Sequence, residues 1–308
     1  MIDILSVISQ MGILLAIVAV GFAAAKCKVF PEGTNKVLAQ LVIVVTNPCT
    51  VLHSVLGSDR ILSNQEVFLL TGIALCVFAV LIFLGRLLPR VLHCPEQDQN
   101  VYRFMTTFAN MGFMGFPVIK ALYGDGAVFY ASIFNLVFQF VVYTYGVALL
   151  APKDSKNRFS WKTLVSPIII ASVLAYIFYL TDFEAPKVIT DGLGMLGNVT
   201  SPVAMLVIGI ALSKVSFKEV FLNWRLYILN LIRLLALPLL AFLILRNFST
   251  DPIMLGIPVV MLGMPVATLT TLMSAKYGGN EKLAASGVFM STLFSFITIP
   301  LLMFVLFS

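Results

Sequence analysis

Charge is scarce in this chain, since charged residues make up 11% of its 308 positions, against about 25% in an ordinary soluble domain. The motifs G-x-S-x-G, H-E-x-x-H and the P-loop are absent, and two histidines are too few for a histidine-rich metal site. None of the 14 Asp and Glu residues lies in the middle of an apolar segment, which disfavours a carboxylate proton relay. We therefore expect neither a soluble protein nor an enzyme, and no cofactor, with sodium coupling left open.

Long apolar segments fill the chain instead, with hydrophobic residues at 60% of the positions. A helix needs about 20 such residues to cross a hydrocarbon core of about 30 Å. No basic stretch precedes the first segment and no small-residue cleavage site follows it, so we expect a spanning helix rather than a removable signal peptide. We predict an all-α membrane protein with ten transmembrane helices, at residues 4–25, 37–56, 67–88, 101–122, 127–150, 162–180, 188–212, 222–245, 252–275 and 283–307.

Lysine and arginine are distributed unevenly between the two ends of these segments. If the N-terminus lies outside, 15 of the 20 Lys and Arg residues fall on the cytoplasmic side and 4 on the outer side. The positive-inside rule therefore predicts that both termini are extracytoplasmic. The formal charge of +6 follows from this placement, and we expect a lipid bilayer rather than a nucleic acid as partner.

A hydrophilic connector at residues 152–162 lies near the midpoint of the chain. It separates a first repeat, residues 1–151, from a second repeat, residues 163–308, and each contains five predicted spans. An odd number of crossings in each half inserts the second half in the opposite sense, as in the inverted repeats of transporters.

Matching motifs support this 5+5 inverted repeat. The interval from Pro48 to Tyr123 is 75 residues, and the interval from Pro202 to Tyr277 is also 75 residues. The prolines inside the fourth and ninth segments do not keep the same register. The repeat is therefore one interpretation, and chance spacing of prolines in a membrane protein is the other.

Glycine and proline interrupt the fourth segment at residues 110–117 (NMGFMGFP) and the ninth at residues 263–268 (GMPVAT). Unwound backbone at membrane depth frees amide and carbonyl groups that protein, water or a ligand must satisfy. Because proline suits the first position of a helix, we expect Pro117 and Pro265 to begin new half-helices. Two such N-termini carry partial positive charge, so crossing segments would form a pocket for an anion.

Polar residues and glycines around these interruptions are candidates for binding the anion, namely Asn110, Gly112, Gly115, Gly263, Thr268 and Thr271. We add Asn47, because we expect a further break at Pro48 in the second segment. The alternative is that all are kinks with locally satisfied polar groups. Asn135 and Gln139, one turn apart, either line the same cavity or bond between helices, which we favour. Arg233, inside the eighth segment, either serves the site or snorkels to the cytoplasmic surface.

These features together resemble the auxin efflux carrier family. The resemblance covers nearly the whole chain and is carried by ten spans, a central cytoplasmic loop and two motifs, N-x-x-x-x-G-x-P at residues 110–117 and M-P-x-A at 264–267. It implies a fold related to bile-acid sodium symporters, with broken helices 4 and 9 crossing at the substrate. It also implies a scaffold domain (segments 1, 2, 6, 7), a transport domain (3–5, 8–10) that moves like an elevator, and a homodimer through scaffold helices. It extends the substrate-binding candidates to Phe116, Pro117, Met264 and Pro265.

The expected function is secondary active or facilitative transport of small organic anions, in particular carboxylates. The short central loop differs from the long loop of many plant members of that family, which favours a bacterial-type permease in the inner membrane. One alternative is a sodium-coupled symporter of larger, bile-acid-like anions, which a sodium requirement would identify. Another is a membrane receptor or sensor, which ligand binding without flux would identify.

Overall fold

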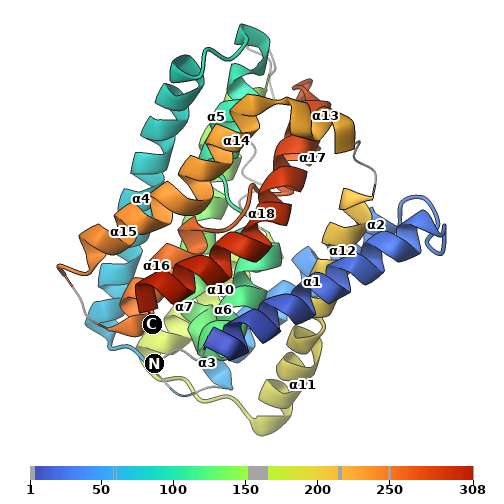
Figure 1. Cartoon of the computed structure of the whole chain (residues 1–308). Coiled ribbons are helices and arrows are strands. Elements are labelled where there is room, and N and C mark those ends of the chain that lie inside the picture. The colour runs from blue at the N-terminus through green and yellow to red at the C-terminus, as the bar shows by residue number, and fades with distance from the viewer. Residues whose placement is uncertain are drawn as a thin grey trace.

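Helices make up the computed structural model of the chain, which describes residues 4–57, 59, 61–151, 166–213, 217–248 and 251–307. Within these residues no strand forms, and one isolated β-bridge joins Ala109 to Val266. The expected all-helical fold class is confirmed (Figure 1). The connector predicted at residues 152–162 lies outside the described residues.

The helices of the first half of the chain are α1 (Ile4–Lys26), α2 (Thr34–Leu41), α3 (Asn47–Leu56), α4 (Asn64–Val91), α5 (Gln99–Thr107), α6 (Phe116–Tyr123), α7 (Ala127–Val141) and α8 (Val147–Leu150). Those of the second half are α10 (Pro167–Thr181), α11 (Lys187–Asn198), α12 (Thr200–Leu212), α13 (Phe217–Leu222), α14 (Trp224–Leu231), α15 (Leu237–Leu245), α16 (Pro252–Leu262), α17 (Leu269–Tyr277) and α18 (Glu281–Phe307). Four π-helical turns join neighbouring helices, namely η1 (Val42–Thr46), η3 (Met111–Gly115), η4 (Val142–Gly146) and η5 (Ile232–Ala236), and a short 3-10 turn, η2 (Glu96–Asp98), precedes α5.

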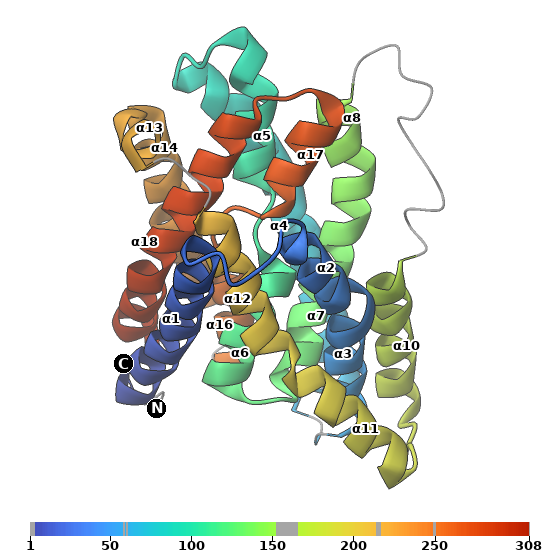
Figure 2. The same ribbon diagram turned by 90° about the vertical axis from the view of Figure 1, so that its right-hand side faces the viewer.

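Among the described residues, six continuous helical stretches of 22 to 28 residues are long and apolar enough to cross a membrane, namely Thr34–Leu56, Asn64–Val91, Ala127–Leu150, Lys187–Leu212, Trp224–Leu245 and Glu281–Leu306. Shorter apolar helices occupy Gly12–Lys26, Met111–Tyr123, Pro167–Thr181 and Pro252–Leu262. Both chain ends lie close together at one end of the molecule, opposite α5 and α13 (Figures 1 and 2).

Three of the π-helical turns stand immediately before a proline. η1 precedes Pro48, η3 precedes Pro117 and η5 precedes Pro238, each at the second residue of the next α-helix. Proline has no N–H and its ring clashes with the carbonyl four residues earlier, so an ordinary α-turn cannot form there. A wider π-turn accommodates one extra residue and lets the helix continue. The break that we predicted at Pro48 is therefore wrong, because the helix runs from Thr34 to Leu56 without interruption.

Glycines allow α1 and α12 to cross in close contact (Figure 2). A Cβ atom built on Gly21 would lie 2.6 Å from the carbonyl oxygen of Leu206, and one built on Gly209 would overlap the carbonyl oxygen of Val18. In lipid, small residues drive helix association because they let two backbones approach closely. The same holds for α3 and α11, where a Cβ on Gly197 would lie 3.1 Å from the Cα of Thr50.

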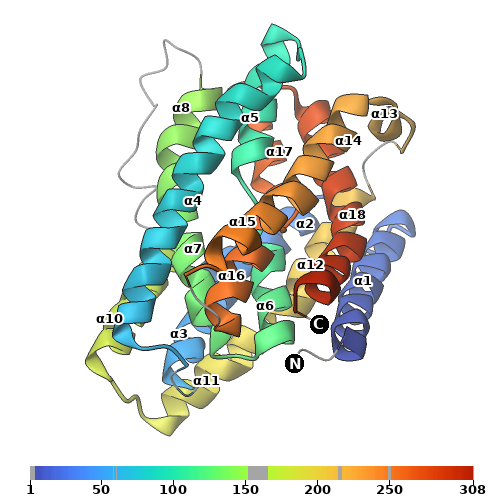
Figure 3. The same ribbon diagram turned by 60° about the vertical axis from the view of Figure 1, so that its left-hand side comes forward.

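Two groups of helices can be followed through their contacts, and further contacts, such as those of α1 with α18 and of α3 with α7, join the two groups. In one, α1 packs on α12, and α3 packs on α10 and α11, where the Thr50 and Thr200 hydroxyl oxygens lie 2.8 Å apart. In the other, α4 packs on α5 and α7, α15 packs on α16, and α17 packs on α18 (Figure 3). The fourth and ninth predicted segments both belong to the second group, which therefore contains both interruptions.

Candidate functional site

Two interrupted helices meet at the centre of the site. α5 ends at Thr107 and η3 begins at Met111, and we call residues 108–110 the first break. α16 ends at Leu262 and α17 begins at Leu269, and we call residues 263–268 the second break. The expected interruption of both segments is thus present in the structure.

Hydrogen bonds join the two breaks as a short antiparallel bridge. The amide of Asn110 donates to the carbonyl of Pro265 at 2.8 Å, and the amide of Ala267 donates to the carbonyl of Phe108 at 3.1 Å. Unwound backbone is tolerated at membrane depth only where it is buried in protein or lines a cavity. Each break therefore provides hydrogen-bond partners for backbone groups that the other break leaves without helical partners.

The new half-helices start at other positions than we predicted. The first restarts at Met111, so Pro117 lies inside the helix, and the second restarts at Leu269, so Pro265 lies within the extended break. The expectation that each proline begins a helix is wrong for Pro265, whereas Pro117 lies at the second residue of α6, directly after the π-turn η3. The first helix restarts before Pro117 because the π-turn η3 accommodates this proline, while Asn110 takes the N-cap position with φ −80° and ψ 63°.

Both helix starts present amides without protein partners. Among the described residues, the amides of Gly112 and Phe113 at the first start, and of Thr268 and Leu269 at the second, donate to no acceptor. The side-chain Nδ2 of Asn110 is also buried and without a partner there, and Asn110 is only 3% exposed. These donors together make an environment suited to a negatively charged group.

A cavity of about 80 Å³, which we call the crossing cavity, lies against these donors. Six of the predicted site residues line it, namely Asn47, Asn110, Gly112, Asn135, Gln139 and Thr268. A Cβ on Gly112 would lie 3.4 Å from Nδ2 of Asn47 and 3.7 Å from Oδ1 of Asn135, so these residues converge from three elements. Asn135 and Gln139 line the cavity and, within the described part of the chain, form no bond between helices, contrary to our preference.

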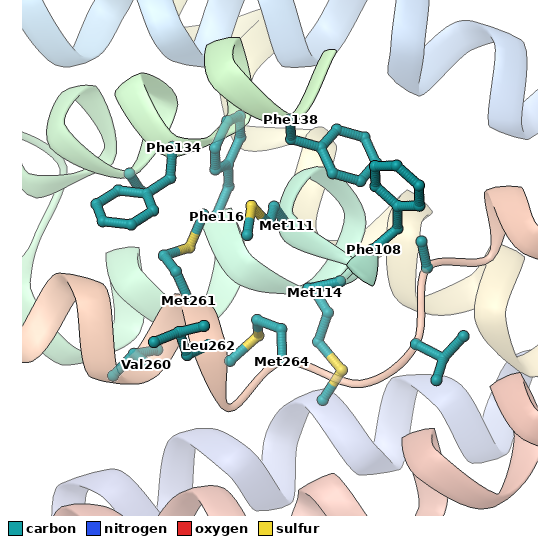
Figure 4. Close-up of a cluster of buried hydrophobic side chains, with 14 of the residues drawn as sticks. Phe108, Met111, Met114, Phe116, Phe134, Phe138, Val260, Met261, Leu262 and Met264 are labelled. Carbon is teal, nitrogen blue, oxygen red and sulfur yellow. The ribbon is translucent and has the colours of Figure 1, made fainter. Parts of the chain in front are cut away.

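Eight other predicted residues do not line the crossing cavity, namely Gly115, Phe116, Pro117, Gly263, Met264, Pro265, Thr271 and Arg233. Phe116 and Met264 belong instead to an apolar cluster with Phe108, Phe134 and Met111 (Figure 4). Met111 of this cluster also lines the crossing cavity, so the apolar cluster adjoins the site.

Sequence reasoning missed several cavity residues, namely Ile43, Ala109, Met111, Phe113, Phe138, Tyr143, Ser166, Ile168, Ala267 and Leu269. Phe138 and Tyr143 are three or four residues from Asn135 or Gln139, so all four lie on one helical face. This spacing could have indicated from the sequence that Phe138 and Tyr143 line the same cavity. No signal in the sequence points to Ile168, because it begins a helix after the connector and reaches the cavity only through tertiary packing.

Comparison with known proteins identifies the family. A family model described as "Membrane transport protein" matches residues 6–303, which is nearly the whole chain. The chain belongs to this family of auxin efflux carrier-like membrane transport proteins. It is 23% identical over 299 residues to the uncharacterized transporter MJ1031 of Methanocaldococcus jannaschii, covering 94% of this chain and 95% of that protein. It is 20% identical over 308 residues to the uncharacterized transporter YfdV of Escherichia coli K12, covering 95% of each.

Arg233 of this transporter lies behind the first break, in the π-turn η5. Its side chain is 1% exposed, so it does not snorkel to the surface. Its Nη1 donates to the carbonyl of Met105 at 3.0 Å and also to the carbonyl of Thr106. Both carbonyls belong to the last turn of α5, which the break leaves without helical partners.

A second and larger cavity of this transporter, about 410 Å³, lies away from the breaks. Three carboxylate side chains line it, those of Asp59, Asp182 and Glu184. Nearby negative charge disfavours an anion, so this cavity does not compete with the crossing cavity as an anion site.

Proposed function

We propose that this transporter carries a small organic anion, in particular a carboxylate, that binds in the crossing cavity. The proposal rests on one observation: residues whose backbone amides have no partner among the described residues, together with Asn110 and its buried, unpartnered Nδ2, line one cavity. No charged side chain of the described residues lines that cavity, so the backbone and amide donors are the groups that would hold the anion. Helix N-termini bind anions in this way without a buried Lys or Arg.

The size of the cavity favours a small substrate. A volume of about 80 Å³ holds several water molecules, each of which needs about 10–15 Å³ on this measure. A small carboxylate matches this volume, whereas a bile-acid-like anion would require the cavity to open considerably. This is the reason to prefer the small anion to the sodium symporter of larger anions.

We further propose that the two packing groups are a scaffold and a mobile transport domain. The scaffold would contain α1, α2–α3, α10 and α11–α12, and the transport domain would contain α4–α8 and α14–α18. In support, both breaks belong to the second group, and Asn47 and Ile168 of the first group complete the wall of the cavity. A site at such a boundary can be exposed to either side by an elevator-like movement of one group.

The membrane orientation belongs to the same proposal. Ten crossings as a 5+5 inverted repeat would bring both termini to one side, and both lie at one end of the molecule (Figure 2). Arg225 donates to the carbonyls of Leu92 and His93, so the ends of α4 and α14 that carry Arg90 and Arg225 lie together. The excess of Lys and Arg at this end supports placing it in the cytoplasm and the termini outside.

Transport in proteoliposomes tests the proposed site. Asn110→Ala removes one unpartnered donor of a residue that lines the cavity. We expect a loss of affinity for a carboxylate such as malonate of about tenfold or more, the value of one hydrogen bond to a charged group. Asn247→Ala, an exposed asparagine at the end of α15, is the matched control and should transport normally.

The contrary result would be unchanged malonate affinity in a folded Asn110→Ala protein. Wild-type protein that binds carboxylates in a thermal-shift screen but shows no flux would favour a receptor. Transport that requires sodium would favour the symporter alternative.

A further inference from the structure

We propose that the Arg233 guanidinium is a built-in cation that occupies the place of a coupling ion at the first break, so that this transporter needs no sodium. The inference rests on the proposed function of the crossing cavity and names how its charge is balanced. Arg233 does not line the cavity, so it is a positioning residue rather than a binding residue.

The position of the guanidinium is that of a helix C-terminal cation. It donates to two carbonyls in the last turn of α5, where the peptide dipoles add up to roughly half a negative charge. In transporters with broken helices, unwound carbonyls and half-helix C-terminal ends are the groups that coordinate sodium. In this chain, an arginine from another helix already occupies that end.

The charge of Arg233 has no acidic partner within the described residues. The ion pair found there joins Lys120 to Asp125 at 2.6 Å, far along the chain from Arg233. A buried cation without a carboxylate is costly unless other groups compensate it. The negative end of α5 supplies part of this compensation, and an anion in the crossing cavity, on the other side of the same break, would supply the rest.

The polar groups around Arg233 do not form a binding site for a second cation. Nε of Arg233 and both polar atoms of Asn230, one turn earlier, are buried without partners in the described part of the chain. These groups include no carboxylate that could neutralise an added sodium ion. The local charge is therefore already that of a site with one cation bound.

Thermal unfolding of the purified protein tests this inference without a transported substrate. The unfolding midpoint of the wild type should be the same in sodium chloride and in choline chloride of equal ionic strength. Arg233→Ala should become sensitive to cations, because it leaves a vacancy beside two carbonyls. Guanidinium at concentrations too low to denature, and sodium to a smaller extent, should then raise its midpoint in a saturable manner.

Arg225→Ala is the matched control. Arg225 also donates to two backbone carbonyls and begins the same helix, but it does so at the surface, at the end of α4. Its removal should create no response to guanidinium or sodium. Arg233→Lys, which keeps the charge, should stay insensitive to sodium.

Saturable stabilisation of the wild type by sodium over choline would overturn the inference, and so would an Arg233→Ala protein that responds to neither cation. If Arg233→Ala does not fold, the wild-type comparison and Arg233→Lys still decide, since a sodium-dependent Arg233→Lys also contradicts the inference. In proteoliposomes, Arg233→Ala should carry malonate only with sodium or guanidinium present. Failure of the wild type to carry malonate would count against the proposed function. The thermal unfolding comparison would still test the role of Arg233, because it uses no transported substrate.

Discussion

The two breaks differ in how the protein holds them. The first is short, at residues 108–110. It has a guanidinium on the helix end before it, and the side-chain Nδ2 of Asn110, without a partner among the described residues, at the helix start after it. The second is longer, at residues 263–268, and its residues 263–267 are buried, as are residues 108–110 of the first. Within the described residues no Lys or Arg donates to the last carbonyls of α16, and the amide of Val266 donates to the Ser291 hydroxyl at 3.0 Å.

This difference separates two tasks that the sequence motifs do not distinguish. The first break is held by charge and directs polar atoms into the crossing cavity. The second is held by apolar packing, supplies backbone partners to the first, and lines the crossing cavity only at Ala267 and Thr268. Substitutions at the first break should therefore change transport, whereas substitutions at residues 263–266, which do not line the crossing cavity, should mainly lower stability.

The largest effect is expected from Asn110→Asp, which keeps the size of the side chain but replaces its donor with a negative charge. Two like charges about 4 Å apart repel by about 4 kcal/mol at an effective dielectric constant of 20. This corresponds to roughly a thousandfold loss of affinity for the anion. Malonate transport in proteoliposomes measures it.

The control for that variant is Asn247→Asp, the same exchange at an exposed position at the end of α15. It should leave affinity within the error of the wild type. An Asn110→Asp protein that transports malonate normally would mean that the first break does not contact the substrate, and the contrast between the breaks would fail.

Met264→Ala tests the packing of the second break. Met264 is 0% exposed, and a Cβ on Gly115, at the end of the π-turn η3, would lie 3.6 Å from its Cγ. Removing a buried methionine side chain costs about 2–5 kcal/mol of unfolding free energy. We expect a lower unfolding midpoint and unchanged affinity for the substrate in the protein that remains folded. Met195→Ala, at a methionine that is 75% exposed, should not lower the midpoint.

A loss of substrate affinity without loss of stability in Met264→Ala would show that this residue binds substrate, as the family resemblance implied. It would also remove the distinction between the two breaks. The measurement is a thermal unfolding curve together with the concentration dependence of transport.

Glycine and proline spacing allowed both interruptions to be predicted from the sequence, because these residues act on their own backbone. The exact restart could not be predicted, because a π-turn and an ordinary helix start both accommodate a proline such as Pro117. The same ambiguity made the expected break at Pro48 wrong. The pairing of Asn110 with Pro265 spans more than 150 residues and depends on how the helices pack.

Arg233 shows a further limit of the sequence. Its depth in an apolar segment marked it as unusual, but both of its acceptors are backbone carbonyls, at Met105 and Thr106. Any residue type can offer a carbonyl, so no side-chain pattern could name the partner. The geometry of a helix that stops three residues before Asn110 was needed to show why the charge is tolerated.

The smallest effect, and the one that separates function from folding most sharply, is expected from Gly112→Ala. The added methyl group would lie at ordinary contact distance from Asn47 and Asn135, 3.4 and 3.7 Å, inside the crossing cavity. Alanine is favoured over glycine in a helix by about 0.5–1 kcal/mol, so the unfolding midpoint should stay level or rise. Affinity for malonate should nevertheless fall, because the methyl group takes volume beside the unpartnered amides.

Gly72→Ala on α4, where an added Cβ meets nothing within 4 Å, should give the same gain in stability without the loss of affinity. If Gly112 lies at the binding site, Gly112→Ala should raise stability and lower affinity for malonate, whereas Gly72→Ala should only raise stability. Equal behaviour of the two variants would mean that the small cavity beside the first break is a packing defect, and that the anion binds elsewhere.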